Sequence, residues 1–97
     1  MPSLVFTDRA QEDLLEAWLY IADDDLVTAD RVVDTIEQES RIREDQPWKG
    51  RVRPELGRQL RSWPTSTPYI LFYTVAELEV RVLRVLHHAR DVRLAAF

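Results

Sequence analysis

The chain has 97 residues, 45% of them hydrophobic, a formal net charge of −4 and no Cys. This length suits a single domain, and the lack of Cys excludes a disulfide scaffold and a thiolate metal site. No apolar run approaches the roughly 18 residues of a membrane span, and the N-terminus lacks the pattern of a signal peptide, so we expect a cytoplasmic protein with no membrane contact.

Charge is divided unevenly along the chain. Residues 1–49 carry 13 acidic and 5 basic residues, whereas residues 50–97 carry 4 acidic residues and 8 Arg. We expect the acidic half to form solvated helical faces and the basic half to meet an anionic partner; the alternative is that the charges only keep the protein soluble. A net acidic chain is poorly suited to tight, unassisted binding of nucleic acid, because that affinity comes largely from neutralising phosphates.

The first half predicts a strand and two helices. Residues 4–7 form a short apolar run, and Thr7 or Asp8 caps the helix that follows, with Asp8 and Gln11 at capping-box spacing. The apolar stripe expected on this helix is Leu14, Leu15, Trp18, Ile21 and Ala22. The expected solvated side is Glu12, Asp13, Glu16 and Asp23.

A second helix is predicted over about Leu26–Asp45. Its buried stripe is Ala29, Val32, Val33 and Ile36. Beyond Ile36 this stripe becomes thin, because Ser40 and Arg43 occupy positions where apolar residues would recur. Two amphipathic helices with a short joint predict an αα-hairpin.

The second half predicts strands. An irregular segment begins at Pro47, a strand covers residues 60–63, and a loop follows Pro64. Tyr69–Ala76 and Glu79–His87 are rich in β-branched and aromatic residues, and the short connection at residues 77–78 predicts an antiparallel hairpin. Residues 89–97 have the propensity for one or two helical turns.

Strict alternation along Glu79–His87 has a chemical consequence. It groups Val80, Val82, Arg84 and Leu86 on one face. A guanidinium among apolar neighbours needs a partner or a wet groove, so Arg84 is a candidate site residue.

The element order is β-α-α-β-β-β. Helices that precede the sheet in this way predict an α+β fold, with the helical hairpin packed on one face of a small, mostly antiparallel sheet. We expect the other face to be open or covered by a partner.

Several motifs in this order resemble the ParE-type toxins of the RelE/ParE toxin–antitoxin superfamily. They are the pattern DLxxAWxYIA at residues 13–22, ADRV at 29–32, GRVR at 50–53, ELG at 55–57, LRS at 60–62 and RVLHHARD at 84–91. The resemblance covers nearly the whole chain. His88 stands where the family usually has Gly, and Ala76–Leu78 replaces its Gly/Asn turn.

The resemblance implies a toxin that inhibits DNA gyrase without catalytic residues, cofactor, metal or small-molecule substrate. It also implies a cognate ParD-like antitoxin that neutralises the toxin, with operator DNA bound only indirectly through that antitoxin. The residues expected to bind the target are Arg61, Arg84, His88 and Arg90. The residues expected to bind the antitoxin are Leu14, Trp18, Ile21, Ile36 and Tyr73.

Each of these residues has a simpler structural explanation. Arg61 and Arg84 form a cationic groove if they share the open sheet face, or else they hold backbone carbonyls or acidic side chains. Arg90 and Asp91 are explained equally well by capping of the last turn. His87 and His88 are not expected to chelate a metal together, because neighbouring strand residues point to opposite faces.

Two other functions stay open. One is a ribosome-dependent mRNA endonuclease, as in the RelE branch, which needs acid–base groups and cations around the scissile phosphate. The single Lys, the acidic balance and the lack of a Glu-Arg-His-Tyr set at the end of the chain argue against it. The other is a decayed toxin that acts only as a binding partner.

Overall fold

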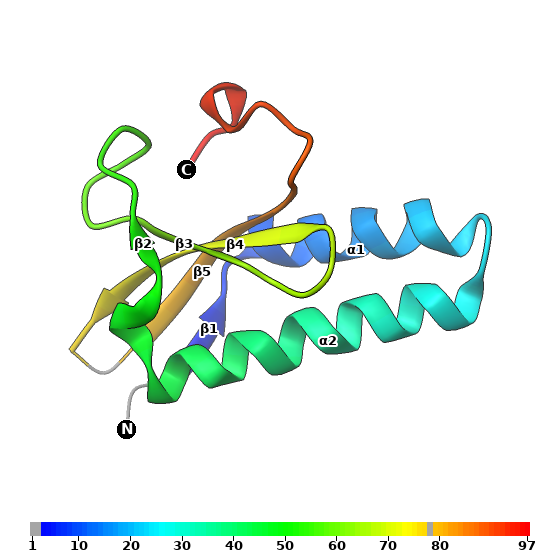
Figure 1. Cartoon of the computed structure of the whole chain (residues 1–97), viewed down its shortest axis with the longest axis horizontal. Coiled ribbons are helices and arrows are strands. Elements are labelled where there is room, and N and C mark those ends of the chain that lie inside the picture. Colours follow the sequence, from blue (N-terminus) through cyan, green and yellow to red (C-terminus); the bar gives the residue numbers. More distant parts are fainter. Residues whose placement is uncertain (1–2, 78) are drawn as a thin grey trace.

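The computed structural model describes residues 3–77 and 79–97. Its helices are α1 (Asp8–Ala22) and α2 (Leu26–Asp45), with two single 3₁₀ turns, η1 (Pro47–Lys49) and η2 (Val92–Leu94). Its strands are β1 (Ser3–Phe6), β2 (Arg51–Val52), β3 (Arg61–Pro64), β4 (Tyr69–Ala76) and β5 (Glu79–His87). The predicted elements are all present, and β2 is an addition to them (Figure 1). The connection predicted at residues 77–78 lies partly outside the described residues.

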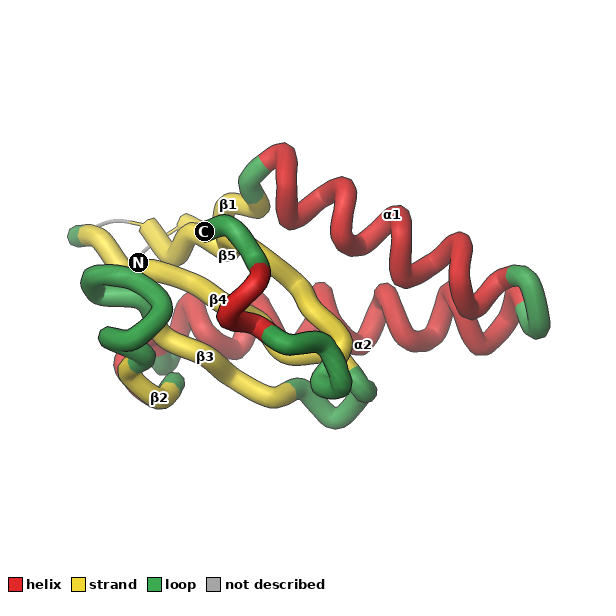
Figure 2. Tube along the Cα trace, turned by 90° about the horizontal axis from the view of Figure 1, so that it is seen from above, coloured by secondary structure: helices red, strands yellow, loops and turns green. Residues whose placement is uncertain are grey.

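The strands form one sheet in the order β1-β5-β4-β3-β2. The β4–β5, β3–β4 and β2–β3 pairs are antiparallel, and β1 pairs with β5 in parallel. Both helices lie on one face, and the turn that joins them is at the opposite end of the molecule from β2 (Figures 1 and 2). The predicted α+β fold is therefore confirmed.

Side-chain caps fix where both helices begin. The Thr7 hydroxyl accepts a hydrogen bond from the Ala10 amide at 3.1 Å, and the Asp25 carboxylate accepts bonds from the Val27 and Thr28 amides. The capping box predicted from Asp8 and Gln11 is wrong. Asp8 is already helical, and the side-chain amide of Gln11 donates from Nε2 to the Phe6 carbonyl.

The buried face of α1 differs from the predicted stripe by one position. Leu14 and Ile21 pack against the core, but Leu15 is 57% exposed, and Asp13 is buried instead of solvated. The small side chains of Ala10 and Ala17 bring the helix close to the sheet. The charge of Asp13 is therefore inside the protein.

The expected thinning of the α2 stripe is also corrected. Ser40 and Arg43 are both buried. The Ser40 hydroxyl donates to the Ile36 carbonyl at 2.8 Å. The Arg43 guanidinium lies 3.9 Å above the Trp63 ring, while its buried Nε and Nη1 atoms have no hydrogen-bond partner among the described residues. This part of α2 leaves no exposed apolar surface at these two positions.

The sheet face away from α2 is not open. It carries a second apolar cluster, in which Leu60, Phe72 and Leu86 are buried beneath Leu56 and the C-terminal segment. Phe97 lies on Phe72 with ring centroids 5.1 Å apart, and the C-terminal segment crosses this face (Figure 2). The chain thus covers this face with its own last residues.

A β-bulge in β5 changes the predicted faces. Val82 is opposite Tyr73 and Arg84 is opposite Phe72, so Leu83 is an extra residue without a partner on β4. Val80 and Val82 belong to the core under the helices, whereas Arg84 and Leu86 share the face of Phe72. The predicted grouping of these four residues on one face is therefore wrong.

Candidate functional site

The cationic groove expected between Arg61 and Arg84 does not form. Arg61 is opposite Tyr73 on the helix-covered face, whereas Arg84 is opposite Phe72 on the other face. The bulge at Leu83 causes this separation, because one inserted residue reverses the facing of all residues after it. The two guanidinium groups cannot act on one phosphate.

Arg84 forms a buried ion pair with Asp13. Its Nε and Nη2 atoms donate to the two Asp13 carboxylate oxygens at 2.7 and 3.0 Å, and Nη1 donates to the Ala96 carbonyl at 2.9 Å. Both side chains are 2% exposed. The prediction that Arg84 touches a target is therefore corrected: this residue joins α1, β5 and the C-terminal segment.

The ion pair lies beyond Val82, where β1 no longer pairs with β5. From that point Thr7 and Asp13 form hydrogen bonds with the backbone groups on the free edge of β5. The Thr7 hydroxyl donates to the Leu83 carbonyl at 3.1 Å, and the Asp13 carboxylate accepts from the Val85 amide at 3.0 Å. Asp13 thus pairs with the charge of Arg84 and also accepts the hydrogen bond of the Val85 amide.

Arg61 holds the turn after α2. Its Nη1 atom donates to the carbonyls of Trp48 and Gly50, at 3.0 and 2.8 Å, and its guanidinium is 5.0 Å from the Trp48 ring centroid. The side chain is partly exposed. Its role in target binding stays a prediction, beside this structural one.

Tyr73 fixes the same turn from inside the core. Its hydroxyl donates to the Pro47 carbonyl and accepts from the Gly50 amide, both at 2.9 Å. A side chain at Gly50 would overlap the Tyr73 phenol, so glycine is required there. Burial raises the pKa of Tyr73 above its ordinary value.

The predicted antitoxin-binding set divides by burial. Ile36 and Tyr73 have no exposed surface, so the expectation of direct contact is corrected, and they support the surface from beneath. Leu14, Trp18 and Ile21 are partly buried, and the Trp18 indole donates to the Asp30 carboxylate at 2.8 Å. Contact with these three residues stays a prediction.

Sequence reasoning did not find the most exposed apolar residues of the helical hairpin, and it placed one of them, Leu15, in the buried stripe. Large apolar side chains with 55–76% exposure occur from the middle of α1 to the start of α2. They are Leu15, Leu19, Tyr20, Leu26 and Val27. We call these five residues the hairpin-end patch. The signal in the sequence was an apolar excess on α1 larger than a single stripe needs.

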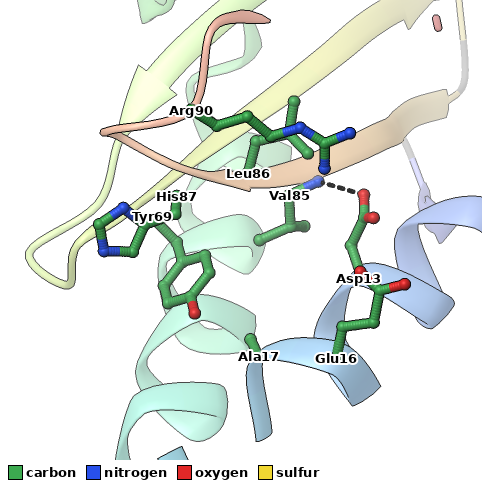
Figure 3. A pocket seen from close by; sticks show the side chains of 8 residues that line it. All are labelled: Asp13, Glu16, Ala17, Tyr69, Val85, Leu86, His87 and Arg90. Carbon is green, nitrogen blue, oxygen red and sulfur yellow. Dashed lines mark hydrogen bonds between the residues drawn. The ribbon is translucent and has the colours of Figure 1, made fainter. Parts of the chain in front are cut away.

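His87 and Arg90 lie around a pocket between α1 and the end of β5 (Figure 3). The pocket is lined by Asp13, Glu16, Ala17, Tyr69, Val85, Leu86, His87 and Arg90. The Tyr69 and His87 rings meet edge to face at 5.3 Å. Arg90 and His88 are exposed, as target binding requires, and that role stays a prediction.

The two His rings are stacked 4.6 Å apart, because His88 follows the last residue of β5. The expectation that they point to opposite faces is therefore wrong. His87 Nδ1 accepts a bond from the Ala89 amide. Across the described part of the chain, no group of three or more metal-ligating side chains occurs.

The last turn is capped as the sequence suggested, with a different partner. The Asp91 carboxylate accepts from the Arg93 amide and forms an ion pair with the Arg93 guanidinium at 2.9 Å. This hydrogen bonding from Arg93 lowers the pKa of Asp91. Arg90 is left out of the pair and remains available in the pocket.

A family model described as the ParE toxin of the type II toxin–antitoxin system parDE matches residues 4–92. The chain belongs to the ParE toxin family. A solved structure titled "Chromosomal ParDE TA system from P. aeruginosa" has 22% sequence identity and a TM-score of 0.77, over 90% of this chain and 96% of that one. At that identity the likeness concerns the fold. No curated protein matches the chain.

As a ParE-family toxin, the chain is the toxin member of a type II toxin–antitoxin system. None of the helices in residues 3–77 and 79–97 is long and apolar enough to cross a lipid bilayer.

Proposed function

We propose that this ParE-family toxin poisons DNA gyrase by binding alone, and that a ParD-like antitoxin encoded beside it neutralises it. The observation that carries the proposal is the separation of Arg61 and Arg84 onto opposite faces of the sheet. A ribonuclease of the RelE branch needs cations and acid–base groups that converge on one phosphate. Here Arg84 is neutralised by Asp13, and its sheet face is filled by apolar side chains.

Target binding is assigned to the exposed cations and to the loop after β5. Arg90 is exposed at the pocket of Figure 3, His88 is exposed and stacks on the His87 ring, and Arg61 is partly exposed on β3. Arg is favoured at the energetic centres of interfaces. The potency of the toxin then comes from a few such contacts, and no side chain transfers a proton.

Antitoxin binding is assigned to the helical hairpin. The hairpin-end patch exposes five large apolar side chains to water, and Leu14, Trp18 and Ile21 lie on α1 beside them. An antitoxin segment that folds on binding would cover it, by a helix in a groove or by strand addition. The complex would reach operator DNA through the antitoxin.

The experiment is inducible expression, followed by gyrase supercoiling and ribosome-dependent mRNA cleavage assays on the same samples. We expect stalled gyrase–DNA complexes while bulk mRNA is intact, and suppression of toxicity by the neighbouring antitoxin gene. Ribosome-dependent cleavage of mRNA would contradict the proposal. The lack of toxicity in every host tested would favour a decayed toxin.

Variants separate binding from catalysis. Arg90→Ala should weaken gyrase inhibition by about 2–4 kcal/mol of binding free energy with an unchanged melting temperature. Arg93→Ala is the matched control, because Arg93 is also exposed on the same segment. His87→Ala and His88→Ala should have modest effects. A loss of about 10²–10⁴-fold from one His variant with an intact fold would indicate acid–base catalysis.

A further inference from the structure

Trp48 is an exposed indole on a rigid turn. Its side chain is 65% exposed. The backbone on both sides is held, because Tyr73 bonds to Pro47 and Gly50 while Arg61 bonds to the Trp48 and Gly50 carbonyls. Ordering this side chain in a complex therefore requires little further loss of entropy, and Trp beside Arg is the composition of an interface centre.

Two hollows meet at this indole. One has about 290 Å³ and is lined by Trp48, Val52, Gln59, Arg61 and Val75. The other has about 350 Å³ and is lined by Pro47, Trp48, Val75, Ala76 and Glu77. We call them together the Trp48 groove. Because they share Trp48 and Val75, they suit two neighbouring side chains on one side of an extended segment, roughly 7 Å apart.

The groove also contains a backbone outlier. Gln59 has φ of 60°, and in the described residues it is the one non-glycine residue with positive φ. A residue with a side chain is strained there, and Gly would relieve this strain. The Gln59 side chain lines the groove, which gives a reason for a residue other than Gly at this position.

Charge gives the groove a direction. Arg61 lines one hollow, on the same face of the sheet as Val52, and its side chain is partly exposed. Glu77 lines the other hollow. An occupant would therefore place acidic residues near Arg61 and neutral or basic residues near Glu77.

A peptide fits this chemistry better than a nucleic acid. Valine side chains line both hollows beside the indole, and Pro47 and Ala76 line the second one. Stacked bases do not fill aliphatic hollows of this kind. The net charge of −4 also opposes binding to phosphates. Two apolar side chains of an acidic segment would instead be buried on either side of Trp48.

We propose that the Trp48 groove binds an extended, acidic segment of the antitoxin, which carries two apolar side chains at alternate positions. This inference rests on the proposed function, because it assigns a second contact to the partner that covers the hairpin-end patch. Strand β2, which carries Val52 of the groove, lies at the end of the molecule away from the turn that joins α1 and α2 (Figure 1).

The test measures the affinity of the purified antitoxin encoded beside the toxin. Trp48→Ala should weaken binding by at least about tenfold with an unchanged melting temperature, and Leu94→Ala is the control, because Leu94 is 83% exposed elsewhere. Val52→Glu should weaken binding of the acidic segment more than Arg51→Glu, because Val52 lines the groove and Arg51 is on the other face of the same strand. In spectra of ¹⁵N-labelled toxin, the Trp48 indole signal should move on binding.

The outcomes separate this inference from the proposed function. If the antitoxin binds and neutralises the toxin while Trp48→Ala and Val52→Glu bind like the wild type, the groove proposal is overturned and the proposed function stands. If no antitoxin binds, the proposed function fails. The groove is then tested with a synthetic acidic peptide that has two alternate Leu residues, against the same peptide with Ser and against oligothymidylate. The peptide proposal is overturned if the Trp48 signal moves with oligothymidylate, or if it moves with none of the three probes.

Discussion

Asp13 shows how one residue can contradict a correct periodicity. It was expected on the solvated side of α1, but its carboxylate is buried with Arg84 and accepts the Val85 amide. Desolvating the two charges opposes folding, and their mutual attraction and hydrogen bonds offset that penalty only while both partners are present. The pair therefore enforces the position of α1 on β5.

Removal of one partner should be much worse than removal of both. We expect Arg84→Ala and Asp13→Ala each to lower the free energy of unfolding by about 3–5 kcal/mol, because an unpaired charge or a broken network is left inside. The double variant Asp13→Ala/Arg84→Ala should lose less than the two single variants together. Denaturant unfolding of the wild type and the three variants measures this coupling.

The control on the same strand is Arg81→Ala. Arg81 pairs with Glu79 at 2.7 Å, but its side chain is 53% exposed, so its loss should change stability little. Strictly additive losses for Asp13 and Arg84 would contradict the assigned coupling.

Tyr73 gives a second prediction at this scale, with a pH dependence. Tyr73→Phe removes two hydrogen bonds and should lower stability by about 1–3 kcal/mol near neutral pH. Burial raises the folded-state pKa of Tyr73, so its stabilisation is present below the unfolded pKa of about 10 and is lost as pH rises toward the folded value. The difference between wild type and Tyr73→Phe should therefore shrink in alkaline solution.

Melting curves between neutral and alkaline pH measure that difference. Tyr20→Phe is the matched control, because Tyr20 is 76% exposed and has no buried hydroxyl to lose. A difference that grows with pH would show that the sign of the Tyr73 effect is wrong.

At the scale of elements, hydrophobic periodicity predicted the regular helices and the long strands. The bounds of α2, β4 and β5 agree with the sequence, because caps, breakers and long apolar runs mark them. The bulge at Leu83 has no such mark, since its neighbours are all suited to a strand, and it moved Arg84 away from Arg61. β2 has two residues, too few for any pattern. The shared face of Arg61 and Arg84 was mispredicted for these reasons, whereas the roles of Arg61, His88 and Arg90 stay predictions.

The C-terminal segment provides the prediction at this scale. Truncation after Asp91 should lower the melting temperature and increase binding of an apolar dye, because Phe72 and Leu86 lose their cover and Arg84 loses the Ala96 carbonyl. Phe97→Ala should have an intermediate effect. Leu94→Ala, at an exposed position of the same segment, should have almost none. A truncated protein with wild-type melting would mean that this segment covers nothing of energetic value.

At the scale of the whole molecule, the hairpin-end patch and the Trp48 groove set the reach that an antitoxin needs. The longest dimension of the protein is 39 Å. One extended segment that covers both ends requires about 12 residues at 3.3 Å each, and a helix of the same length requires about twice that number. A tail of this size is short enough to be degraded or folded as one unit.

The parallel pairing of β1 with β5 determines when the toxin can exist during synthesis. Ser3–Phe6 pairs with Glu79–Val82, so β1 waits for a segment that is synthesised 76 residues later, and Thr7 and Asp13 also wait for Leu83 and Arg84. The sheet therefore cannot be completed while β5 is still in the exit tunnel of the ribosome. Until β5 has emerged, the helical hairpin has no complete sheet to cover, and the buried ion pair between Asp13 and Arg84 does not exist.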